Sequence, residues 1–363
     1  MKQKVGILTW HYYPNFGSAL QAYALQRSVQ SLGYDTEIVN YRDKKYGQYS
    51  QAKQFLQACL HQMLSDMFPR FRYPFQHFQQ RYLKETRLVQ DQGELEAVCR
   101  GFDCIVCGSD QIWAPNVLNP MYLLCAVPAG VRKVSYAASI GLNEIPDSLV
   151  ALYKDSLSKF HAVSVRESVG AGILQDTCQI STEVVLDPTL LLSASSWQSL
   201  EHPVRLLPEG KFIFCYFLKK DHHYDRGVRA FAQNAGLQII GYSANDEDEQ
   251  WMSKQLRHIG PREFLWLIHH AEAVITDSYH GTIFSLLYHK KFITIERFQN
   301  SETICQNSRI YQLQTYFGLH KQIITSSTPG LWAIEAVDYE KFERELSQLR
   351  LKSNAFLENA LRS

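Results

Sequence analysis

The first forty residues constrain the fold most, because they place one helix-length segment between two short apolar runs. Residues 5–10 and 36–41 are the apolar runs, and residues 19–32 carry apolar side chains at helical spacing before Gly33. Gly commonly follows the last turn of a helix. A strand, a helix and a second strand in this order predict a βαβ unit with parallel strands. The chain therefore opens as a Rossmann-like α/β domain.

The same alternation continues along the chain and restarts once, after the polar stretch 193–210. In the first half, strands that we expect to extend the first sheet are predicted at residues 104–106, 133–136, 161–165 and 183–186. In the second half, strands are predicted at residues 212–217, 237–240, 273–275 and 292–295. Helices are predicted there at residues 264–270, 282–289, 309–317 and 339–361.

A chain of 363 residues exceeds the size at which one hydrophobic core usually stops growing. We predict a Rossmann-like N-terminal domain over 1–195, a second Rossmann-like domain over 196–335 and a C-terminal helical segment over 336–363. Two such domains predict a GT-B-like arrangement with an interdomain cleft, in which ligands bind. We assign the acceptor to the first domain and an anionic donor to the second.

Composition excludes several classes of function. The formal net charge is +1, so nothing in the overall charge favours a nucleic acid partner. The start of the chain lacks a signal-peptide pattern and no apolar run is long enough to cross a bilayer, which predicts a cytoplasmic protein.

No metal-binding motif stands out in the sequence. Cys104 and Cys107 lie three residues apart in a predicted strand and face opposite sides of the sheet, which favours two buried thiols over a shared metal ion. The acidic run 245–249 is typical of a solvated loop, and no metal site is predicted.

Apolar pairs recur at helical spacing over residues 55–68, beside Arg70, Arg72 and Arg81. Such a helix usually packs on its own domain. The alternative is peripheral contact with a membrane, which would place the protein at the inner face of the membrane.

His280 marks the most informative turn of the second domain. It follows the predicted strand 273–275 and precedes an apolar helix, and ligands of open α/β sheets bind at such turns. Backbone N–H groups at a helix start attract anions, and an imidazole can donate to a phosphate or transfer a proton near neutral pH. Gly281 would let a ligand approach the backbone closely. The alternative is a histidine that caps its own helix.

Arg166 occupies a comparable turn in the first domain, after the predicted strand 161–165. Its guanidinium suits a carboxylate or a phosphate. A salt bridge to Glu167 or to another acid is the alternative.

Two further turns of the first domain carry side chains that suit sugar hydroxyls. These candidates are Asn15, Gly17, Asp110 and Gln111, with Trp113 as a stacking face. Neither turn contains a glycine-rich dinucleotide or P-loop motif. Turn capping is the alternative for Asn15 and Asp110.

Several motifs occur in a characteristic order from about Val5 to Leu319. They lie at residues 15–25, 108–113, 135–141, 164–167, 186–191, 260–264 and 276–288. In their order and spacing the chain resembles the polysaccharide pyruvyl transferase family. The resemblance implies a GT-B-like fold and transfer of a pyruvyl group from phosphoenolpyruvate to two hydroxyls of a sugar, forming a cyclic ketal and releasing phosphate.

By the same resemblance, His280 would be the acid or the phosphate ligand, and Arg166 would anchor the carboxylate or the phosphate. Asp110 is predicted to be the base for the sugar hydroxyl. The donor site would include Ser278, Gly281 and Thr282. Lys290, Lys291, Arg297 and Arg309 are further candidates for the anion site.

One position departs from the family pattern, which has arginine two residues before the histidine. This chain has Ser278 there, so either Arg297 or Arg309 replaces that arginine or the donor differs. The predicted acceptor is a sugar, an oligosaccharide or a lipid-linked glycan, and no cofactor is expected beyond phosphoenolpyruvate as co-substrate. The alternatives are a GT-B glycosyltransferase that uses a nucleotide sugar and a catalytically silent glycan-binding protein of envelope assembly.

Overall fold

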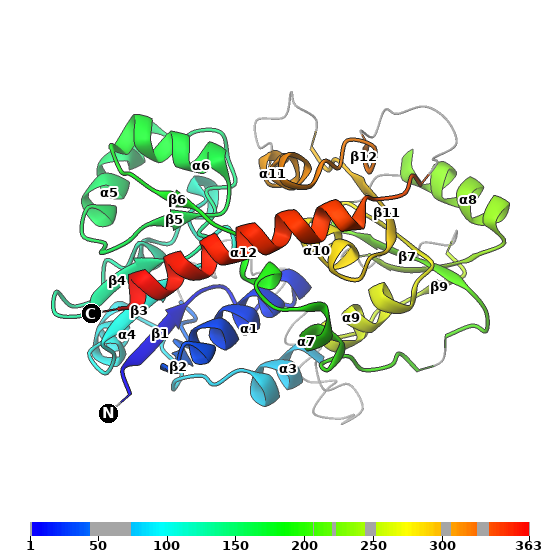
Figure 1. Cartoon of the computed structure of the whole chain (residues 1–363). Coiled ribbons are helices and arrows are strands. Elements are labelled where there is room, and N and C mark those ends of the chain that lie inside the picture. The colour runs from blue at the N-terminus through cyan, green and yellow to red at the C-terminus, as the bar shows by residue number, and fades with distance from the viewer. Residues whose placement is uncertain are drawn as a thin grey trace. The chain divides into compact units, whose positions relative to one another are not determined.

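The computed structural model describes residues 2–43, 74–205, 207–219, 223–243, 252–298, 306–324 and 334–362 (Figure 1). The predicted helix over 55–68 and the acidic run 245–249 lie outside these residues. The chain divides into two units, the first formed by Met1–Leu191 with Leu349–Ser363 and the second by Leu192–Gln348. The division falls close to the predicted boundary at 195, but the C-terminal helix is shared between the units.

Unit 1 contains a four-stranded parallel sheet in the order β2-β1-β3-β4. The strands are β1 (Lys4–Leu8), β2 (Asp35–Ile38), β3 (Cys104–Cys107) and β4 (Arg132–Ser135). The parallel strands and the helix between β1 and β2 confirm the predicted βαβ opening. Cys104 and Cys107 are free buried thiols that belong to separate core clusters, as the strand periodicity predicts.

The prediction that later strands extend this sheet is wrong for β5 (Ser164–Val165) and β6 (Glu183–Val184). These two form a separate two-stranded sheet that meets the first only through isolated bridges. Two serines lie at the contact between β4 and β5. Ser135 Oγ donates to the Ser164 carbonyl at 3.0 Å, and Ser164 Oγ donates to the Ser135 carbonyl at 2.9 Å. The hydroxyls thus take the place of ladder hydrogen bonds between Ser135 and Ser164. Backbone bonds join the neighbouring positions, from the His161 N–H to the Lys133 carbonyl and from the Arg166 N–H to the Ala138 carbonyl.

Helices of unit 1 are α1 (Phe16–Ser31), α3 (Pro74–Tyr82), α4 (Gln92–Cys99), α5 (Asp147–Leu157) and α6 (Ser168–Ile173), and α12 (Tyr339–Leu361) enters it from unit 2. Shorter helical turns lie at Pro115–Val117, Pro120–Leu123, Leu174–Cys178 and Pro188–Leu190. Helix α1 is largely buried because its side chains are mostly small or apolar on every face.

Unit 2 contains a six-stranded parallel sheet in the order β12-β11-β10-β7-β8-β9. Its strands are β7 (Phe212–Phe217), β8 (Gln238–Ser243), β9 (Lys254–Gln255), β10 (Ala273–Thr276), β11 (Lys291–Ile295) and β12 (Ile323–Ile324). Its helices are α7 (Ala194–Gln198), α8 (His223–Ala235), α9 (Pro261–His270), α10 (Tyr279–Leu287) and α11 (Ser308–Phe317). Buried residues of β7 and β10 are continuous apolar runs, as expected for strands covered on both faces.

No helix among the described residues has the length and apolar character needed to cross a membrane.

Candidate functional site

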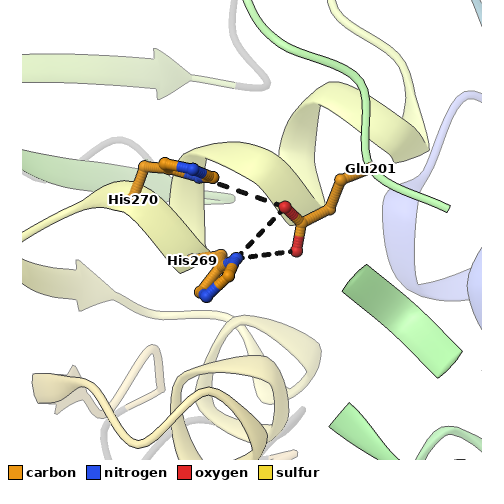
Figure 2. A group of neighbouring side chains, drawn as sticks. All are labelled: Glu201, His269 and His270. Carbon is orange, nitrogen blue, oxygen red and sulfur yellow. Dashed lines mark hydrogen bonds and ion pairs between the residues drawn. The ribbon is translucent and has the colours of Figure 1, made fainter. Parts of the chain in front are cut away.

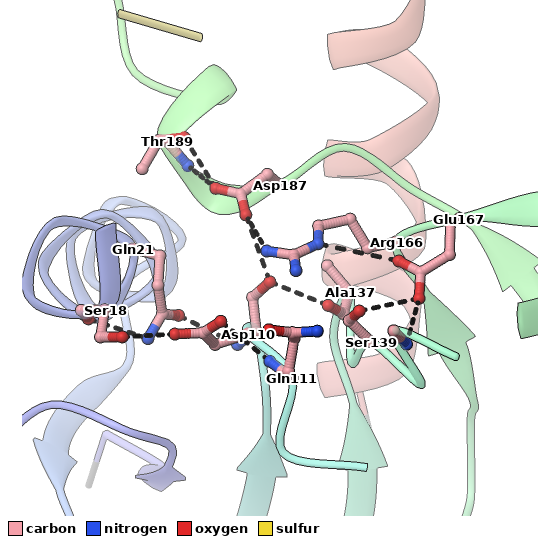
Figure 3. Close-up of polar contacts among 12 residues, drawn as sticks. Ser18, Gln21, Asp110, Gln111, Ala137, Ser139, Arg166, Glu167, Asp187 and Thr189 are labelled. Atoms are coloured by element: carbon pink, nitrogen blue, oxygen red, sulfur yellow. Dashed lines mark hydrogen bonds and ion pairs between the residues drawn. The ribbon is translucent and has the colours of Figure 1, made fainter. Parts of the chain in front are cut away.

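In unit 1, polar side chains gather where β1, β3 and β4 end (Figure 3). Asp110 follows β3 in the left-handed conformation, with φ of +72°, and is 7 % exposed. Its Oδ2 accepts a 2.5 Å hydrogen bond from the Ser18 hydroxyl, and its Oδ1 accepts from the backbone N–H of Gln111. The fold thus holds one carboxylate in a fixed orientation at the carboxyl edge of the sheet, where ligands bind in this fold class.

Gln21, a residue of α1, connects the segment after β1 to the segment after β3 through its side-chain amide. Its Nε2 donates to Thr9 Oγ1, to the Trp10 carbonyl and to the Ser18 carbonyl, at 2.9–3.0 Å. Its Oε1 accepts from the backbone N–H of Ser109 at 3.1 Å. One buried amide therefore sets the position of the residue directly before Asp110.

Arg166 lies in a buried ion-pair network beside the same loops (Figure 3). Its Nη1 donates to Asp187 Oδ2 at 2.8 Å, and its Nε lies 3.8 Å from Glu167 Oε2. Only about one hundredth of the Arg166 side chain is exposed (1 %), and the Asp187 side chain is fully buried. The salt bridge that was the alternative for this arginine is therefore present.

The two carboxylates of this network, those of Asp187 and Glu167, accept hydrogen bonds from the turns after β3 and β4. Asp187 Oδ2 lies 3.4 Å from the Ser109 hydroxyl. Glu167 Oε1 accepts from the Ser139 hydroxyl at 2.8 Å and from the backbone N–H of Ile140 and Gly141. Arg166 thus orients two carboxylates that in turn hold the turns after β3 and β4.

The other acceptor candidates of unit 1 differ in their placement. Asn15 caps α1, because its Oδ1 accepts from the Ser18 N–H at 3.0 Å, and Gly17 is buried in the first turn of that helix. Gln111 packs against Gly141, where an added Cβ would lie 2.2 Å from Gln111 Nε2. The prediction that Trp113 offers a stacking face is wrong. Its ring is fully buried and its Nε1 donates to the Tyr122 carbonyl.

In unit 2, His280 lies in the first turn of α10 rather than in the preceding loop. The helix begins at Tyr279 because Ser278 is its N-cap, with Oγ accepting from the Gly281 N–H at 3.3 Å. Thr282 is fully buried, and its hydroxyl contacts the Ser278 carbonyl and Thr294 Oγ1. A Cβ on Gly281 would lie 2.6 Å from Thr276 Oγ1, so this glycine lets α10 approach β10 closely.

Arg309 and Tyr279 lie next to His280 and place a positive charge near the start of α10. The Arg309 guanidinium lies 5.7 Å from the centre of the Tyr279 ring, and that ring meets the His280 ring at 5.2 Å edge to face. Arg309 is 6 % exposed and His280 is 7 % exposed. Arg297 and Arg309 are the two arginines proposed to replace the one missing at Ser278. Arg309 contacts Tyr279, the first residue of α10, and therefore lies at the helix start.

Asp277 links this helix start to the end of β7. Its two carboxylate oxygens accept from the backbone N–H groups of Leu218 and Lys219 at 2.7 and 2.8 Å. Burial raises the pKa of Asp277, while the charge of Arg297 acts in the opposite direction. Lys219 Nζ donates to the Arg297 carbonyl at 3.0 Å. Lys219 and Arg297 therefore lie together beside Asp277 at the carboxyl ends of β7 and β11.

Two other predicted cations lie at the opposite edge of the sheet. Lys291 is the first residue of β11, and Lys290 directly precedes it. Lys290 Nζ donates to the His269 carbonyl at the end of α9. This placement corrects the prediction that either lysine completes an anion site with His280.

A hollow of about 480 Å³ lies in unit 1 between α12 and the segments before β5 and β6. Its lining includes His161, Glu183, Lys352 and Phe356. His161 precedes β5 whereas Arg166 follows it, so the hollow lies at the amino edge, away from the ligand-binding edge of a parallel sheet.

Sequence reasoning missed several residues of these sites. Asp277 directly follows β10 and Lys219 is the second residue after β7, so the rule that singled out His280 could have found both. Gln21 and Asp187 had no such signal, because their partners lie far away in sequence.

The fold and these edges define an α/β protein with two Rossmann-like domains of the GT-B class. Among solved structures, UDP-GlcNAc 2-epimerase from Neisseria meningitidis bound to UDP-GlcNAc matches with a TM-score of 0.55 and 8% identity, over 100% of this chain and 95% of that one. The enzyme from Methanocaldococcus jannaschii matches with a TM-score of 0.52 and 12% identity, over 96% and 92%. These similarities confirm the predicted fold class.

A search of curated proteins finds no match. The sequence profile of the family described as polysaccharide pyruvyl transferase matches residues 15–298. The chain therefore belongs to the polysaccharide pyruvyl transferase family, as its motifs predict.

Proposed function

We propose that the protein transfers a pyruvyl group from phosphoenolpyruvate to two hydroxyls of a sugar in a cell-surface glycan or its precursor. The observation that carries the proposal is the grouping of His280, Tyr279 and Arg309 at the start of α10. Phosphoenolpyruvate bears a carboxylate and a phosphate on one small skeleton. A guanidinium beside a helix N-terminus suits such a dianion.

In the proposed reaction, unit 2 binds the donor and unit 1 binds the sugar. His280 protonates the enol methylene, which makes the central carbon of the donor electrophilic. One sugar hydroxyl attacks that carbon as Asp110 accepts its proton. The second hydroxyl then attacks the same carbon, its proton passes to the now neutral His280, and the C–O bond to phosphate breaks. The products are a cyclic ketal and inorganic phosphate.

Arg166 has a positioning role in this proposal rather than direct contact with the donor. Its ion pair with Asp187 and the contacts of Glu167 hold the turns on which Asp110 lies. Arg309 and Lys219 are the donor anchors that we propose instead, with Arg297 beside them. This arrangement would supply the positive charge that the family pattern places at the position of Ser278.

The acceptor side of the proposal comprises Asp110, Ser18 and Gln111, with Asn15 and Gly17 shaping the first turn of α1. The acceptor is a free sugar, an oligosaccharide or a lipid-linked glycan. The proposed reaction needs phosphoenolpyruvate as co-substrate and no further cofactor. We propose a cytoplasmic location, where phosphoenolpyruvate is available.

The test is incubation of purified protein with phosphoenolpyruvate and a panel of glycosides and lipid-linked sugars. We expect phosphate release that depends on the acceptor, together with the mass of a pyruvyl ketal on the product. His280→Ala should abolish both signals. His289→Ala is the matched control, because His289 lies just beyond the same helix in an exposed pair with Glu343.

The result that would overturn the proposal is release of a nucleotide from a nucleotide sugar by the same protein, without use of phosphoenolpyruvate. Asp110→Asn tests the base separately. We expect its turnover to fall by about 100-fold or more, with the melting temperature little changed. Turnover at the wild-type rate would remove Asp110 from the mechanism.

A further inference from the structure

Glu201, His269 and His270 form a cluster in unit 2 that the proposed reaction does not use (Figure 2). The two histidines are the last residues of α9, and Glu201 lies in the segment that follows α7. One ligand atom from each residue lies within 4.8 Å of the others. His269 Nδ1 is 3.0 Å from Glu201 Oε1 and 3.1 Å from Oε2, and His270 Nδ1 is 4.0 Å from Oε2.

We propose that these three side chains bind a divalent transition-metal ion, with Zn²⁺ as the preferred ion and water as the fourth ligand. Two imidazoles and a carboxylate are a common zinc ligand set. Ligands about 2.1 Å from a tetrahedral ion lie about 3.4 Å apart. The His269–Glu201 separation of 3.0 Å and the His270–Glu201 separation of 4.0 Å lie on either side of that value, and all three ligand atoms lie within 4.8 Å of one another. This site departs from the expectation of no metal in this chain.

Negative potential at this place comes from Glu201 and the end of α9, and it is opposed by two cations: Lys290 Nζ donates to the His269 carbonyl at 2.8 Å, and Arg262 Nη2 donates to the Glu201 carbonyl at 3.1 Å. Glu201 is largely buried, with 9 % of its side chain exposed, and the two histidines occupy the last turn of α9, where the helix dipole is negative. Burial raises the pKa of Tyr288, and the negative charge of Glu201 acts in the same direction. The Tyr288 ring stacks on His269 at 4.8 Å, which fixes the orientation of that imidazole.

Gln198 is placed beside His269, where metal-bound histidines usually have an outer hydrogen bond. Its Nε2 lies 3.3 Å from His269 Nε2, so the metal-binding tautomer requires the amide to be turned over. The two orientations of an amide occupy the same volume. In one, the amide oxygen accepts from Nε2–H, and the lone pair on Nδ1 then faces Glu201. In this tautomer His269 binds a metal rather than donating a hydrogen bond to the carboxylate.

His270 is the ligand that can change its orientation on metal binding, and its contact with Trp266 makes that change measurable by fluorescence. Its side chain is 44 % exposed, so the ring has room to turn. At present its Nδ1 bonds to the Trp266 carbonyl at 2.9 Å, and its ring stacks on Trp266 at 4.3 Å. Binding of a metal through His270 should therefore change this stack and the fluorescence of Trp266.

The site lies away from the proposed chemistry within unit 2. Tyr288, which stacks on His269, is the C-cap of α10, whereas His280 lies in the first turn of that helix. Eight residues of helix separate them by about 12 Å. The metal would therefore act on stability, by joining the segment after α7 to the end of α9.

The experiment is titration of the chelator-treated full chain with Zn²⁺ in phosphate-free buffer, by calorimetry and by Trp fluorescence. We expect one site per chain and a rise in melting temperature with Zn²⁺. Glu201→Gln and His270→Ala should each remove this site, and Gln198→Leu should weaken it by about tenfold or more. His280→Ala should retain it.

The matched control is His289→Ala, which removes a histidine from another His–Glu pair, one for which the described part of the chain offers no second histidine ligand. We expect this variant to bind Zn²⁺ like the wild type. Because His270 is exposed, His270→Ala should fold normally, which circular dichroism checks. Equal Zn²⁺ affinity in the wild type, Glu201→Gln and His270→Ala would show an ordinary His–Glu ion pair and overturn the proposal.

Discussion

Arg166 donates to Asp187 across 2.8 Å, and both side chains are buried. Breaking a buried ion pair from one side leaves an uncompensated charge in the core. We therefore predict that Arg166→Met lowers the free energy of unfolding by about 3–5 kcal/mol. Urea denaturation measures this change. Arg166→Met combined with Asp187→Leu should recover only part of the loss, because the Asp187 charge is removed but the buried Glu167 carboxylate still lacks its cation.

The control for this prediction is Lys159→Ala, which removes an exposed ion pair with Asp155 and should change stability far less. Arg166→Met also distinguishes a positioning role of Arg166 from direct binding of the donor. If Arg166→Met unfolds like the wild type but no longer responds to phosphoenolpyruvate, Arg166 binds the donor directly and the positioning role is wrong.

A second prediction concerns Gly281 and Thr276. A methyl group at Gly281 would meet Thr276 Oγ1 at 2.6 Å and Cγ2 at 3.0 Å. Gly281→Ala should therefore destabilise the protein by about 1–3 kcal/mol through overpacking. Adding Thr276→Ala to it removes both contacting atoms and should restore part of the loss. Thermal denaturation of the two variants measures this. Normal stability in Gly281→Ala with loss of phosphoenolpyruvate binding would instead show that the glycine makes room for the ligand.

How much the sequence predicts depends on where the determining contacts lie. The bounds of β7 and α12 match the predictions, residues 212–217 and 339–361, because each element has its periodicity within its own segment. The predicted start of α10 at residue 282 is later than the observed start at Tyr279, because the N-cap Ser278 acts through a side-chain hydrogen bond that periodicity does not reveal. The separation of the β5–β6 sheet involves hydroxyls of Ser135 and Ser164, which are 29 residues apart.

Site residues could likewise be predicted where their position depends on the local sequence. Residues directly after strands reach the carboxyl edge of a parallel sheet wherever the strand is correctly placed, which is why Asp110 and His280 could be singled out. Burial could not be predicted in this way. Trp113 occupies such a turn, yet its ring packs in the core, where its Nε1 donates to the Tyr122 carbonyl. The Tyr153 hydroxyl donates to the backbone carbonyl of Trp113.

A third prediction concerns pH. Burial lowers the pKa of His11 to about 4, from an ordinary value of 6.5, and its Nδ1 bonds to the Thr9 carbonyl. The unfolded chain therefore binds a proton at His11 below pH 6.5, whereas the folded chain stays neutral there until about pH 4. By linkage, stability should be lost as the pH falls through this window, by about 3 kcal/mol from this residue.

Glu85 lies beside His11, with Oε1 at 3.5 Å from His11 Nε2, and burial raises the pKa of Glu85. A raised carboxyl pKa acts in the opposite direction, because stability from this group falls as pH rises. Urea denaturation between pH 4 and 6.5 on the wild type, His11→Gln and Glu85→Gln separates the two. We expect the smallest loss on acidification in His11→Gln. An equal loss in His11→Gln and the wild type would contradict the assignment.

The last prediction concerns Arg309, whose guanidinium lies 5.7 Å from the Tyr279 ring centre next to His280. Hydrogen bonds to charged groups contribute about 1.5–3 kcal/mol, so Arg309→Gln should raise KM for phosphoenolpyruvate by about tenfold to a hundredfold. Arg309→Lys should recover part of the affinity, because it keeps the charge without the planar fork. Arg344→Gln is the control, since Arg344 is exposed on α12. A lowered kcat with unchanged KM in Arg309→Gln would show that Arg309 does not anchor the donor, and Lys219 and Arg297 would then be the remaining candidates on that edge.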